Sequence, residues 1–249
     1  MDKDNYKGII LAGGAGTRLY PLTKIVSKQL LPIYDKPMIY YPLELLIKAG
    51  IQDILIITTE EDLDKFKNLL GDGKNFGINL DYFTQKKPEG IAQAFIIAEK
   101  WINSSSVVLL LGDNLFFGNK LEMTIKNAIE KNSGATIFCK EVENPERFGV
   151  VEINDELKVL SIEEKPIKPI SNYVVTGLYI YDNLVCEYAK SLKKSDRGEF
   201  EITDLNNIYL NKKRLESIIL DNSFSWLDTG TFDSLLEASI FVKENKEFF

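Results

Sequence analysis

Residues 7–22 read KGIILAGGAGTRLYPL and join a short apolar run to a cluster of glycines. The apolar run at residues 9–12 predicts a buried strand, and three glycines follow it within four positions. Glycine lets a backbone approach a ligand closely and adopt positive φ without steric cost. Successive backbone N–H groups can then form a concave anion site. Because Arg18 adds a planar fork of donors suited to phosphate oxygens, the stretch predicts a strand that ends in a phosphate-binding loop.

Two better-known phosphate loops do not fit this stretch. In the dinucleotide motif G-x-G-x-x-G the third glycine is replaced by Leu19, and G-x-x-x-x-G-K-[ST] has no match here. On the glycines alone, a strand ending in a flexible turn is an equally good interpretation. Only the residues that follow the loop can distinguish a phosphate-binding loop from a flexible turn.

The composition is ordinary for a soluble globular protein and excludes several classes of function. The 249 residues suffice for one large domain with a full core. A net charge of −7 and few basic clusters argue against a nucleic-acid partner. The chain has no histidine, which excludes imidazole chemistry. No apolar run approaches the roughly 20 residues that a membrane helix needs, so we expect a cytoplasmic protein with no membrane partner.

Apolar periodicity predicts strands alternating with helices in the first half of the chain. The expected strands are residues 52–59, 80–85 and 107–111, and the expected helices are 61–70 and 91–102. A further helix is expected to be capped by Asp35, opened by Lys36 and Pro37, kinked at Pro42 and ended by Gly50. The alternation predicts parallel pairing in a three-layer α/β sandwich.

The second half has fewer helices between its strands. Strands are expected at residues 135–142, 150–153, 159–163, 173–181 and 215–220, and helices at 184–192, at 202–211 and from 232, after a turn through Asp228. We expect some of these strands to be antiparallel. Cys139 and Cys186 lie far apart without metal-ligand spacing, so they are expected to be reduced and structural.

The continuation of the glycine loop is longer and more specific. After LAGGAGTRLYPLT come SKQLLPI at residues 27–33 and KPMI at residues 36–39. This run resembles the sugar-phosphate nucleotidyltransferases, whose signature is G-G-x-G-T-R-L-x-P-x-T with a lysine further on. The resemblance covers nearly the whole chain. It implies a single domain, residues 1–249, with a three-layer Rossmann-like fold, a mixed, mainly parallel central sheet and extra strands on the sugar side. A nucleotide-binding half would cover about 7–130, and a sugar-phosphate-binding half about 131–249.

The resemblance implies that a nucleoside triphosphate binds the glycine loop. The implied nucleotide contacts are Leu11, Ala12, Gly13, Gly14, Gly16, Thr17, Gln85, Pro88 and Gly90. Arg18 and Lys28 would be catalytic cations, because positive charge there stabilises the departing pyrophosphate. By its local sequence alone, Lys28 is equally an ordinary solvated loop lysine. The amide of Gln85 can pair with both a carbonyl and an imide N–H of a pyrimidine.

Two aspartates are candidate metal ligands. The strand LLL at residues 109–111 runs into Gly112 and Asp113, which places a carboxylate where open α/β sheets bind ligands. Asp228 lies in the segment WLDTG. Either aspartate could instead cap a following turn or helix. The resemblance makes both of them Mg²⁺ ligands, and Mg²⁺ suits few protein carboxylates combined with phosphate oxygens and water.

The resemblance places the sugar phosphate against the second half of the chain. Lys165 would hold the phosphate as a catalytic residue, Glu164 would bond sugar hydroxyls, and the Gly149 backbone would line the pocket. The remaining implied contacts are Asn114, Val175, Tyr179 and Trp226. By pattern alone, Glu164 and Lys165 form a solvated strand end, and a Val/Tyr-rich strand is plain core.

The implied reaction transfers a thymidylyl group from dTTP to α-D-glucose 1-phosphate and releases pyrophosphate by in-line attack at the α-phosphorus. Such a transfer needs positioning and charge neutralisation rather than a strong base, which suits a chain without histidine. Its product feeds deoxysugar synthesis, typically of rhamnose for polysaccharide. Two alternatives stay open: a uridylyltransferase that uses UTP, and a regulatory subunit that binds a nucleotide sugar without catalysis.

The family also implies a homo-oligomer, either a dimer or a tetramer. Its longer members carry additional C-terminal helices that help to form a regulatory nucleotide site at a subunit interface. The sequence of this chain runs to Phe249. The expectation is therefore that feedback inhibition by dTDP-rhamnose is weakened or absent.

Overall fold

The computed structural model describes residues 6–14 and 16–245, which form an α/β fold of two compact units. The glycine-loop unit comprises residues 7–88, 110–126 and the chain from 223 onward. The strand-rich unit comprises residues 89–109 and 127–222, together with Tyr6 at the start of the described chain. The chain passes between the units within three elements, β1 (Tyr6–Leu11), β6 (Ser106–Leu111) and α5 (Leu121–Lys131), and also after residues 88 and 222.

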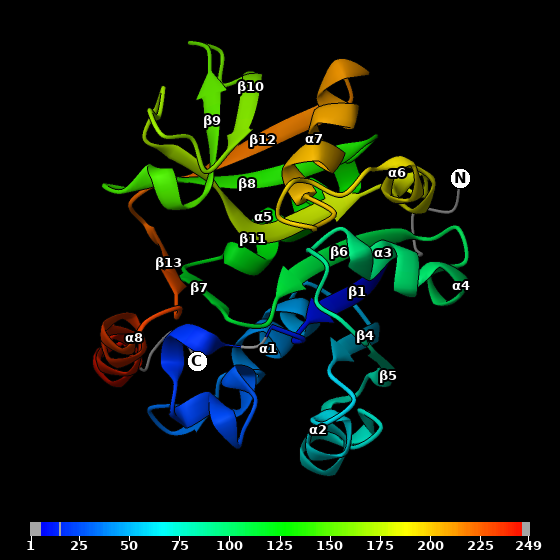
Figure 1. Cartoon of the computed structure of the whole chain (residues 1–249), viewed down its shortest axis with the longest axis vertical. Coiled ribbons are helices and arrows are strands. Elements are labelled where there is room, and N and C mark those ends of the chain that lie inside the picture. The colour runs from blue at the N-terminus through cyan, green and yellow to red at the C-terminus, as the bar shows by residue number, and fades with distance from the viewer. Residues whose placement is uncertain (1–5, 15, 246–249) are drawn as a thin grey trace. The chain divides into compact units, whose positions relative to one another are not determined.

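Parallel strands form the centre of the glycine-loop unit (Figure 1). They are β1 (Tyr6–Leu11), β4 (Asp53–Thr58) and β5 (Asn79–Thr84). In β1, Ile9 lies opposite Leu55 of β4, and both side chains are fully buried. Consecutive buried residues are typical of a sheet covered on both faces, so the predicted strands and their parallel pairing are confirmed.

Helices and short ribbons complete the glycine-loop unit. Its helices are α1 (Tyr40–Lys48), α2 (Leu63–Leu70) and α8 (Phe232–Glu244), with 3₁₀ turns at Thr17–Leu19, Leu22–Lys24, Lys28–Leu30 and Lys74–Phe76. Its antiparallel ribbons pair β2 (Pro32–Ile33) with β3 (Lys36–Pro37), and β7 (Asn114–Gly118) with β13 (Phe224–Asp228). One apolar cluster joins the ribbons to α1 and α8, namely Ile33, Met38, Tyr41, Leu115, Phe117, Ala238 and Val242.

The helix predicted to begin at Asp35 is wrong at its start. Lys36 and Pro37 form strand β3, and the helix begins at Tyr40. The amides of Met38 and Ile39 donate to the carbonyls of Leu31 and Gln29, so the loop takes up these backbone groups before a helix can form. Pro42 therefore lies in the first helical turn, where its missing N–H costs nothing, and it is not an interior kink.

The strand-rich unit mixes parallel and antiparallel pairs, as expected (Figure 1). Strand β8 (Ala135–Glu141) pairs with β11 (Tyr173–Tyr181) antiparallel and with β12 (Leu215–Leu220) parallel. Strand β9 (Gly149–Ile153) pairs antiparallel with β10 (Val159–Glu164) and with β11. The other elements are α3 (Gln93–Ile97), α4 (Glu99–Ile102), α6 (Val185–Ser191), α7 (Ile202–Asn211) and a 3₁₀ turn at Pro145–Arg147.

The structure differs from the sequence prediction in two further assignments and two missed elements. The single helix expected over residues 91–102 is broken at Ala98 into α3 and α4. The turn expected through Asp228 is the end of strand β13. Strand β7 and helix α5 were not predicted. Cys139 and Cys186 are buried free thiols, as expected.

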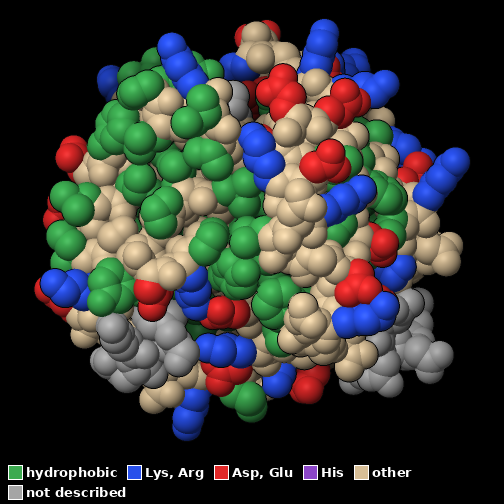
Figure 2. Space-filling view, turned by 90° about the horizontal axis from the view of Figure 1, so that it is seen from below, with side chains coloured by type: hydrophobic (Ala, Val, Ile, Leu, Met, Phe, Trp, Pro, Cys, Tyr) green, Lys and Arg blue, Asp and Glu red, His purple; other side chains and the backbone are tan. Residues whose placement is uncertain are grey.

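The helices and the surface charges bear on whether a membrane or a nucleic acid is a partner. None of the helices in the described part of the chain combines the length and the apolar character needed to cross a bilayer. Where charged side chains gather on the face shown in Figure 2, mainly on its right and lower parts, acidic and basic ones lie among each other. That face therefore lacks the single-sign field that attracts a polyanion.

The start of α8 offers a direct test of this fold. The Thr231 hydroxyl accepts from the Ser234 amide at 3.2 Å, and the Ser234 hydroxyl accepts from the Thr231 amide at 3.0 Å. Such a capping box satisfies two amides that the helix leaves unpaired. We expect Thr231→Ala to lower the free energy of unfolding by about 1 kcal/mol in urea unfolding experiments.

Thr231→Ser is the matched control, because it keeps the capping hydroxyl, and it should lie close to the wild type. An equal loss in both variants would show that the hydroxyl does not cap the helix.

Candidate active site

The glycine loop begins where β1 ends, and it lies directly against Gln85. The Ala12 amide donates to the Ile57 carbonyl at 2.7 Å, which carries the pairing one residue past the strand. A β-carbon at Gly13 would lie only 2.5 Å from Oε1 of Gln85, a side chain that is 4 % exposed. The structure thus joins two segments that the sequence analysis singled out separately, and it gives a steric reason for glycine at position 13.

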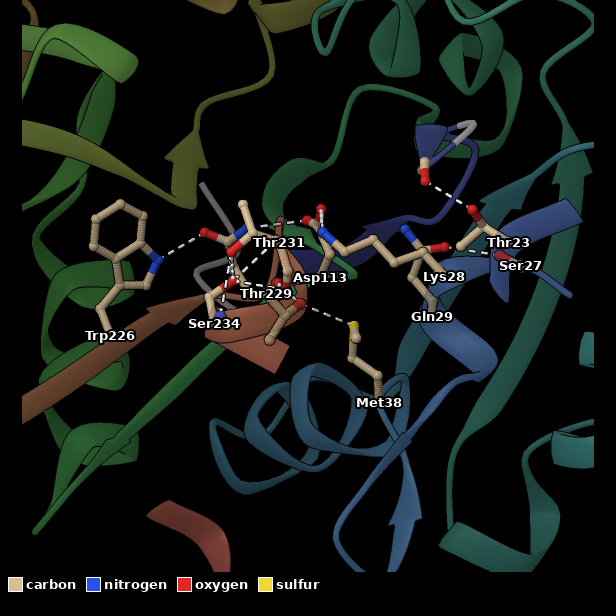
Figure 3. Close-up of polar contacts among 12 residues, drawn as sticks. Thr23, Ser27, Lys28, Gln29, Met38, Asp113, Trp226, Thr229, Thr231 and Ser234 are labelled. Atoms are coloured by element: carbon tan, nitrogen blue, oxygen red, sulfur yellow. Dashed lines mark hydrogen bonds and ion pairs between the residues drawn. The ribbon is translucent and has the colours of Figure 1, made fainter. Parts of the chain in front are cut away.

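The loop then turns back over Lys28. Gly16 adopts a left-handed backbone with φ of 58°, which glycine adopts at little cost. The Thr23 hydroxyl donates to the Gly16 carbonyl at 2.7 Å and closes the turn (Figure 3). A β-carbon at Gly16 would lie 3.3 Å from Cβ of Lys28. The tight turn therefore packs directly on the lysine.

Lys28 is not a solvated loop lysine, because it lies in a buried polar segment. Ser27, Lys28 and Gln29 are only 7, 5 and 3 % exposed. The Ser27 hydroxyl donates to Oε1 of Gln29 at 2.8 Å. Gly112 makes room for this segment, since a β-carbon there would lie 3.0 Å from Cγ of Gln29. Local packing therefore fixes the position from which the Lys28 side chain extends.

The ammonium of Lys28 meets the carboxylate of Asp113 at 2.6 Å (Figure 3). The second carboxylate oxygen accepts from the Asn114 amide at 3.0 Å, and the Trp226 indole N–H donates to Asn114 at 2.7 Å. Burial disfavours the charged form of Asp113, but Lys28 and the Asn114 hydrogen bond outweigh it and hold the pKa of this carboxyl below its usual value. Asp113 is therefore an ionised carboxylate with fixed partners.

Asp228 lies beside this ion pair through the β7–β13 ribbon. In the ribbon register Asp228 lies opposite Asn114, the neighbour of Asp113. The Thr229 hydroxyl donates to the Asp113 carbonyl at 2.9 Å, which anchors the backbone of both aspartates (Figure 3). A β-carbon at Gly230 would lie 2.8 Å from the Arg18 guanidinium. Both predicted cations and both predicted carboxylates thus belong to one region of the glycine-loop unit.

The two aspartates supply only part of what a divalent cation needs. Among the described residues, no three Cys, Asp or Glu side chains gather as a potential metal site. A pair of aspartates leaves most positions to water and to substrate oxygens, which is how Mg²⁺ commonly binds. The donor set therefore fits a hard divalent ion that shares its ligands with a phosphate.

In the strand-rich unit, a second polar cluster surrounds Glu164. The Thr203 hydroxyl donates to Oε2 of Glu164 at 2.6 Å, and a β-carbon at Gly149 would lie 3.4 Å from the same oxygen. The Val175 side chain lies 3.8 Å from that β-carbon position. Gly149, Glu164 and Val175, which the sequence analysis linked only by resemblance, therefore share one site.

Lys165 follows Glu164 with an unusual backbone. Its φ of 46° lies in the left-handed region, which a non-glycine residue adopts only when its surroundings impose it. The Lys165 amide donates to the Phe148 carbonyl at 2.9 Å, and its ammonium lies 3.6 Å from Glu164. The side chain is about half exposed, so the ammonium is available to a ligand.

Several predicted contacts have clear structural roles of their own. Tyr179 is 3 % exposed and stacks on Tyr181 with ring centroids 6.1 Å apart. Burial and the nearby Glu164 raise the pKa of Tyr179. Gly90 has φ of 97°, and a side chain there would run into the backbone of Phe200. Packing alone therefore accounts for Tyr179 and Gly90, whereas Pro88 and Thr17 are exposed.

Arg197 is a member of the Glu164 cluster that was not predicted from the sequence. Its guanidinium donates to Glu201 at 2.8 Å and to Glu164 at 3.3 Å, so it joins the cluster around Glu164. The residue lies in a polar turn, SDRGEF, without apolar periodicity. Because only the fold brings it to Glu164, no local pattern indicated its place.

Comparisons with known proteins agree along nearly the whole chain. The family described as nucleotidyl transferase matches residues 7–245. The glucose-1-phosphate thymidylyltransferase of Neisseria meningitidis is 59 % identical over 95 % of this chain and 82 % of its own length. The Mycobacterium tuberculosis protein of the same name is 56 % identical over the same shares.

Solved structures show the same fold. A Bacillus anthracis protein, provisionally assigned as a glucose-1-phosphate thymidylyltransferase and solved with sucrose, superposes with a TM-score of 0.89 at 42 % identity, covering 96 % of both chains. A UDP-glucose pyrophosphorylase in complex with UDP-glucose superposes with a TM-score of 0.84 at 26 % identity, covering 96 % of this chain and 99 % of its own. The expected mixed, mainly parallel nucleotidyltransferase fold is confirmed, and the chain belongs to the nucleotidyl transferase family.

Proposed function

We propose that this chain transfers a thymidylyl group from dTTP to α-D-glucose 1-phosphate, forming dTDP-glucose and pyrophosphate. The observation that carries the proposal is the identity of 54–59 % over 95 % of the chain to proteins named for this activity. The ion pair of Lys28 and Asp113, with Asp228 and Arg18 in the same region, supports the proposal. Enzymes of this family act on nucleotide and sugar-phosphate substrates and generally use a divalent metal.

The nucleotide is assigned to the glycine-loop unit. Backbone N–H groups of residues 11–14, 16 and 17 cradle the triphosphate, and Gln85 reads the base from its position against Gly13. Arg18 and Lys28 neutralise the charge that develops on pyrophosphate as it departs. Asp113 and Asp228 are proposed to hold Mg²⁺, which when bound supplies further neutralisation of the phosphate oxygens.

The sugar phosphate is assigned to the strand-rich unit. Lys165 and Arg197 hold its phosphate, and Glu164, fixed by Thr203, accepts hydrogen bonds from sugar hydroxyls. The phosphate oxygen of this substrate attacks the α-phosphorus in line. Because a phosphate monoester is already ionised at neutral pH, the step needs positioning rather than a general base.

The main alternative is the same reaction with UTP in place of dTTP. The structural match to a UDP-glucose pyrophosphorylase supports this alternative. A thymine methyl contact in an apolar pocket is worth about 1 kcal/mol, roughly fivefold in rate. A regulatory subunit without catalysis is the less favoured alternative, because Arg18, Lys28, Asp113 and Asp228 are all present. The homo-oligomer, the cytoplasmic location and the role in deoxysugar synthesis stay predictions.

Pyrophosphate release with glucose 1-phosphate and Mg²⁺ tests the reaction directly. We expect release with dTTP to be roughly fivefold faster than with UTP at equal concentration. Asp113→Asn should lower the rate at least about a hundredfold, as for other losses of transition-state charge stabilisation. Equal rates with both nucleotides would retain the chemistry but refute the thymidylyl assignment. Nucleotide binding without any release would favour the regulatory subunit.

The glycine loop provides a second test through two neighbouring glycines. Gly13→Ala should displace Gln85, lowering the melting temperature of the free protein as well as its affinity for dTTP. A β-carbon at Gly14 would meet no described atom within 4 Å. We therefore expect Gly14→Ala to keep the melting temperature and to lower only the dTTP affinity, measured by calorimetry. Unchanged affinity in both variants would contradict the cradle.

The sugar-phosphate assignment is tested at Lys165. Lys165→Met keeps the length of the side chain but removes its charge. We expect KM for glucose 1-phosphate to rise roughly tenfold or more, the scale for losing one charge-assisted hydrogen bond, while KM for dTTP stays unchanged. Lys168→Met, at a nearby exposed lysine, is the control and should match the wild type. A rise in both KM values would point to misfolding instead.

A further inference from the structure

In the proposed function, Lys28 binds the triphosphate and Asp113 binds the metal, yet in the free protein the two side chains bind each other. The inference below rests on the proposed function, because it requires that Asp113 bind the metal and that Lys28 bind the triphosphate. The ammonium lies 2.6 Å from Oδ2 of Asp113, and the Lys28 side chain is 5 % exposed. A divalent cation on that carboxylate would meet a positive charge already in place, and two cations on one carboxylate repel each other.

The other contacts of Asp113 are less able to yield. Asn114, which donates to Oδ1, is itself held by the Trp226 indole at 2.7 Å. The Asp113 carbonyl is held by the Thr229 hydroxyl (Figure 3). Lys28, in contrast, reaches the carboxylate through a long side chain with several rotatable bonds. The ammonium of Lys28 is therefore the partner that an arriving metal displaces.

A displaced Lys28 needs a new acceptor. Its neighbours Ser27 and Gln29 bond each other through their side chains, and the segment is buried. An unpaired ammonium in such a place is strongly unfavourable. The triphosphate is the group that can supply oxygens to it, which makes metal binding without nucleotide weak.

We propose that Lys28 is the internal counter-ion of Asp113 and keeps divalent metal from binding in the absence of nucleotide. When a triphosphate binds, Lys28 moves from the carboxylate to phosphate oxygens, and Asp113 becomes free for metal. Lys28 then has two successive partners, and the metal site is completed only with nucleotide present. By linkage, nucleotide and metal each raise the affinity for the other.

The test measures metal binding by the whole chain without nucleotide. Mn²⁺, which prefers the same oxygen ligands as Mg²⁺, is titrated into the protein while free Mn²⁺ is followed by electron paramagnetic resonance. Lys28→Met and Lys28→Gln are compared with the wild type. Lys28→Gln retains a hydrogen-bond donor for Asp113 and guards against a folding defect, which melting curves monitor. Lys24→Met, at an exposed lysine of the same loop, is the matched control.

We expect both Lys28 variants to bind Mn²⁺ roughly tenfold or more tightly than the wild type, because the metal no longer competes with a buried ion pair. Mn²⁺ should also raise their melting temperatures more than that of the wild type, by mass action. Lys24→Met should behave as the wild type, and Lys28→Met combined with Asp113→Asn should return to weak binding.

Two results would overturn the inference, and only the second of them would also refute the proposed metal site. If both Lys28 variants bind Mn²⁺ no more tightly than the wild type while Asp113→Asn abolishes binding, Lys28 is not a competitor, and the proposed metal site survives. If Asp113→Asn leaves Mn²⁺ binding unchanged in the presence of dTTP, the metal assignment of Asp113 fails, and the competition fails with it.

Discussion

The ion pair between Lys28 and Asp113 is the central interaction of the candidate site in the glycine-loop unit. The Lys28 side chain is only 5 % exposed, so its ammonium needs an acceptor at that position, whereas Asp113, at 26 % exposed, is also reached by solvent. The surrounding residues make the contact possible. Gly112 admits the Lys28 segment, Gly16 turns the loop over it, and Thr229 fixes the Asp113 backbone.

The β7–β13 ribbon positions Asp228 relative to Asp113. Its register places Asp228 opposite Asn114, and the Trp226–Asn114 hydrogen bond locks the two strands together. The strand ends shortly before Thr231, whose hydroxyl caps α8. Because α8 packs into the same apolar cluster as Met38 and Leu115, the position of one carboxylate depends on the docking of a helix far along the chain.

The sequence alone predicted those elements and residues that a local pattern of residue types determines. Helix α7 and strand β12 have the predicted limits. The apolar residues of α7 repeat with the helical period, and β12 ends in a short apolar run. Asp113 was singled out because a carboxylate after a buried strand lies where open α/β sheets bind ligands, but its proposed role as a metal ligand came from the family resemblance. The helix at Asp35 was misplaced because its first amides bond Leu31 and Gln29. Strand β7 and Arg197 were missed because their partners lie far away in the sequence, Trp226 of β13 for the strand and Glu164 for the arginine.

The same electrostatic arrangement recurs in both units, each taken by itself. In one, the cation proposed for the triphosphate is paired with Asp113; in the other, Lys165 and Arg197, proposed for the sugar phosphate, contact Glu164. A long cationic side chain held by a carboxylate has lost much of its rotamer freedom before a phosphate arrives, which lowers the entropy cost of binding. The same pairing makes each phosphate compete with a carboxylate. The Lys28 side chain is 5 % exposed, whereas those of Lys165 and Arg197 are 48 and 41 % exposed and are screened by solvent. An exchange of partner is therefore resisted more strongly at Lys28, and the stricter control of ligand entry falls there.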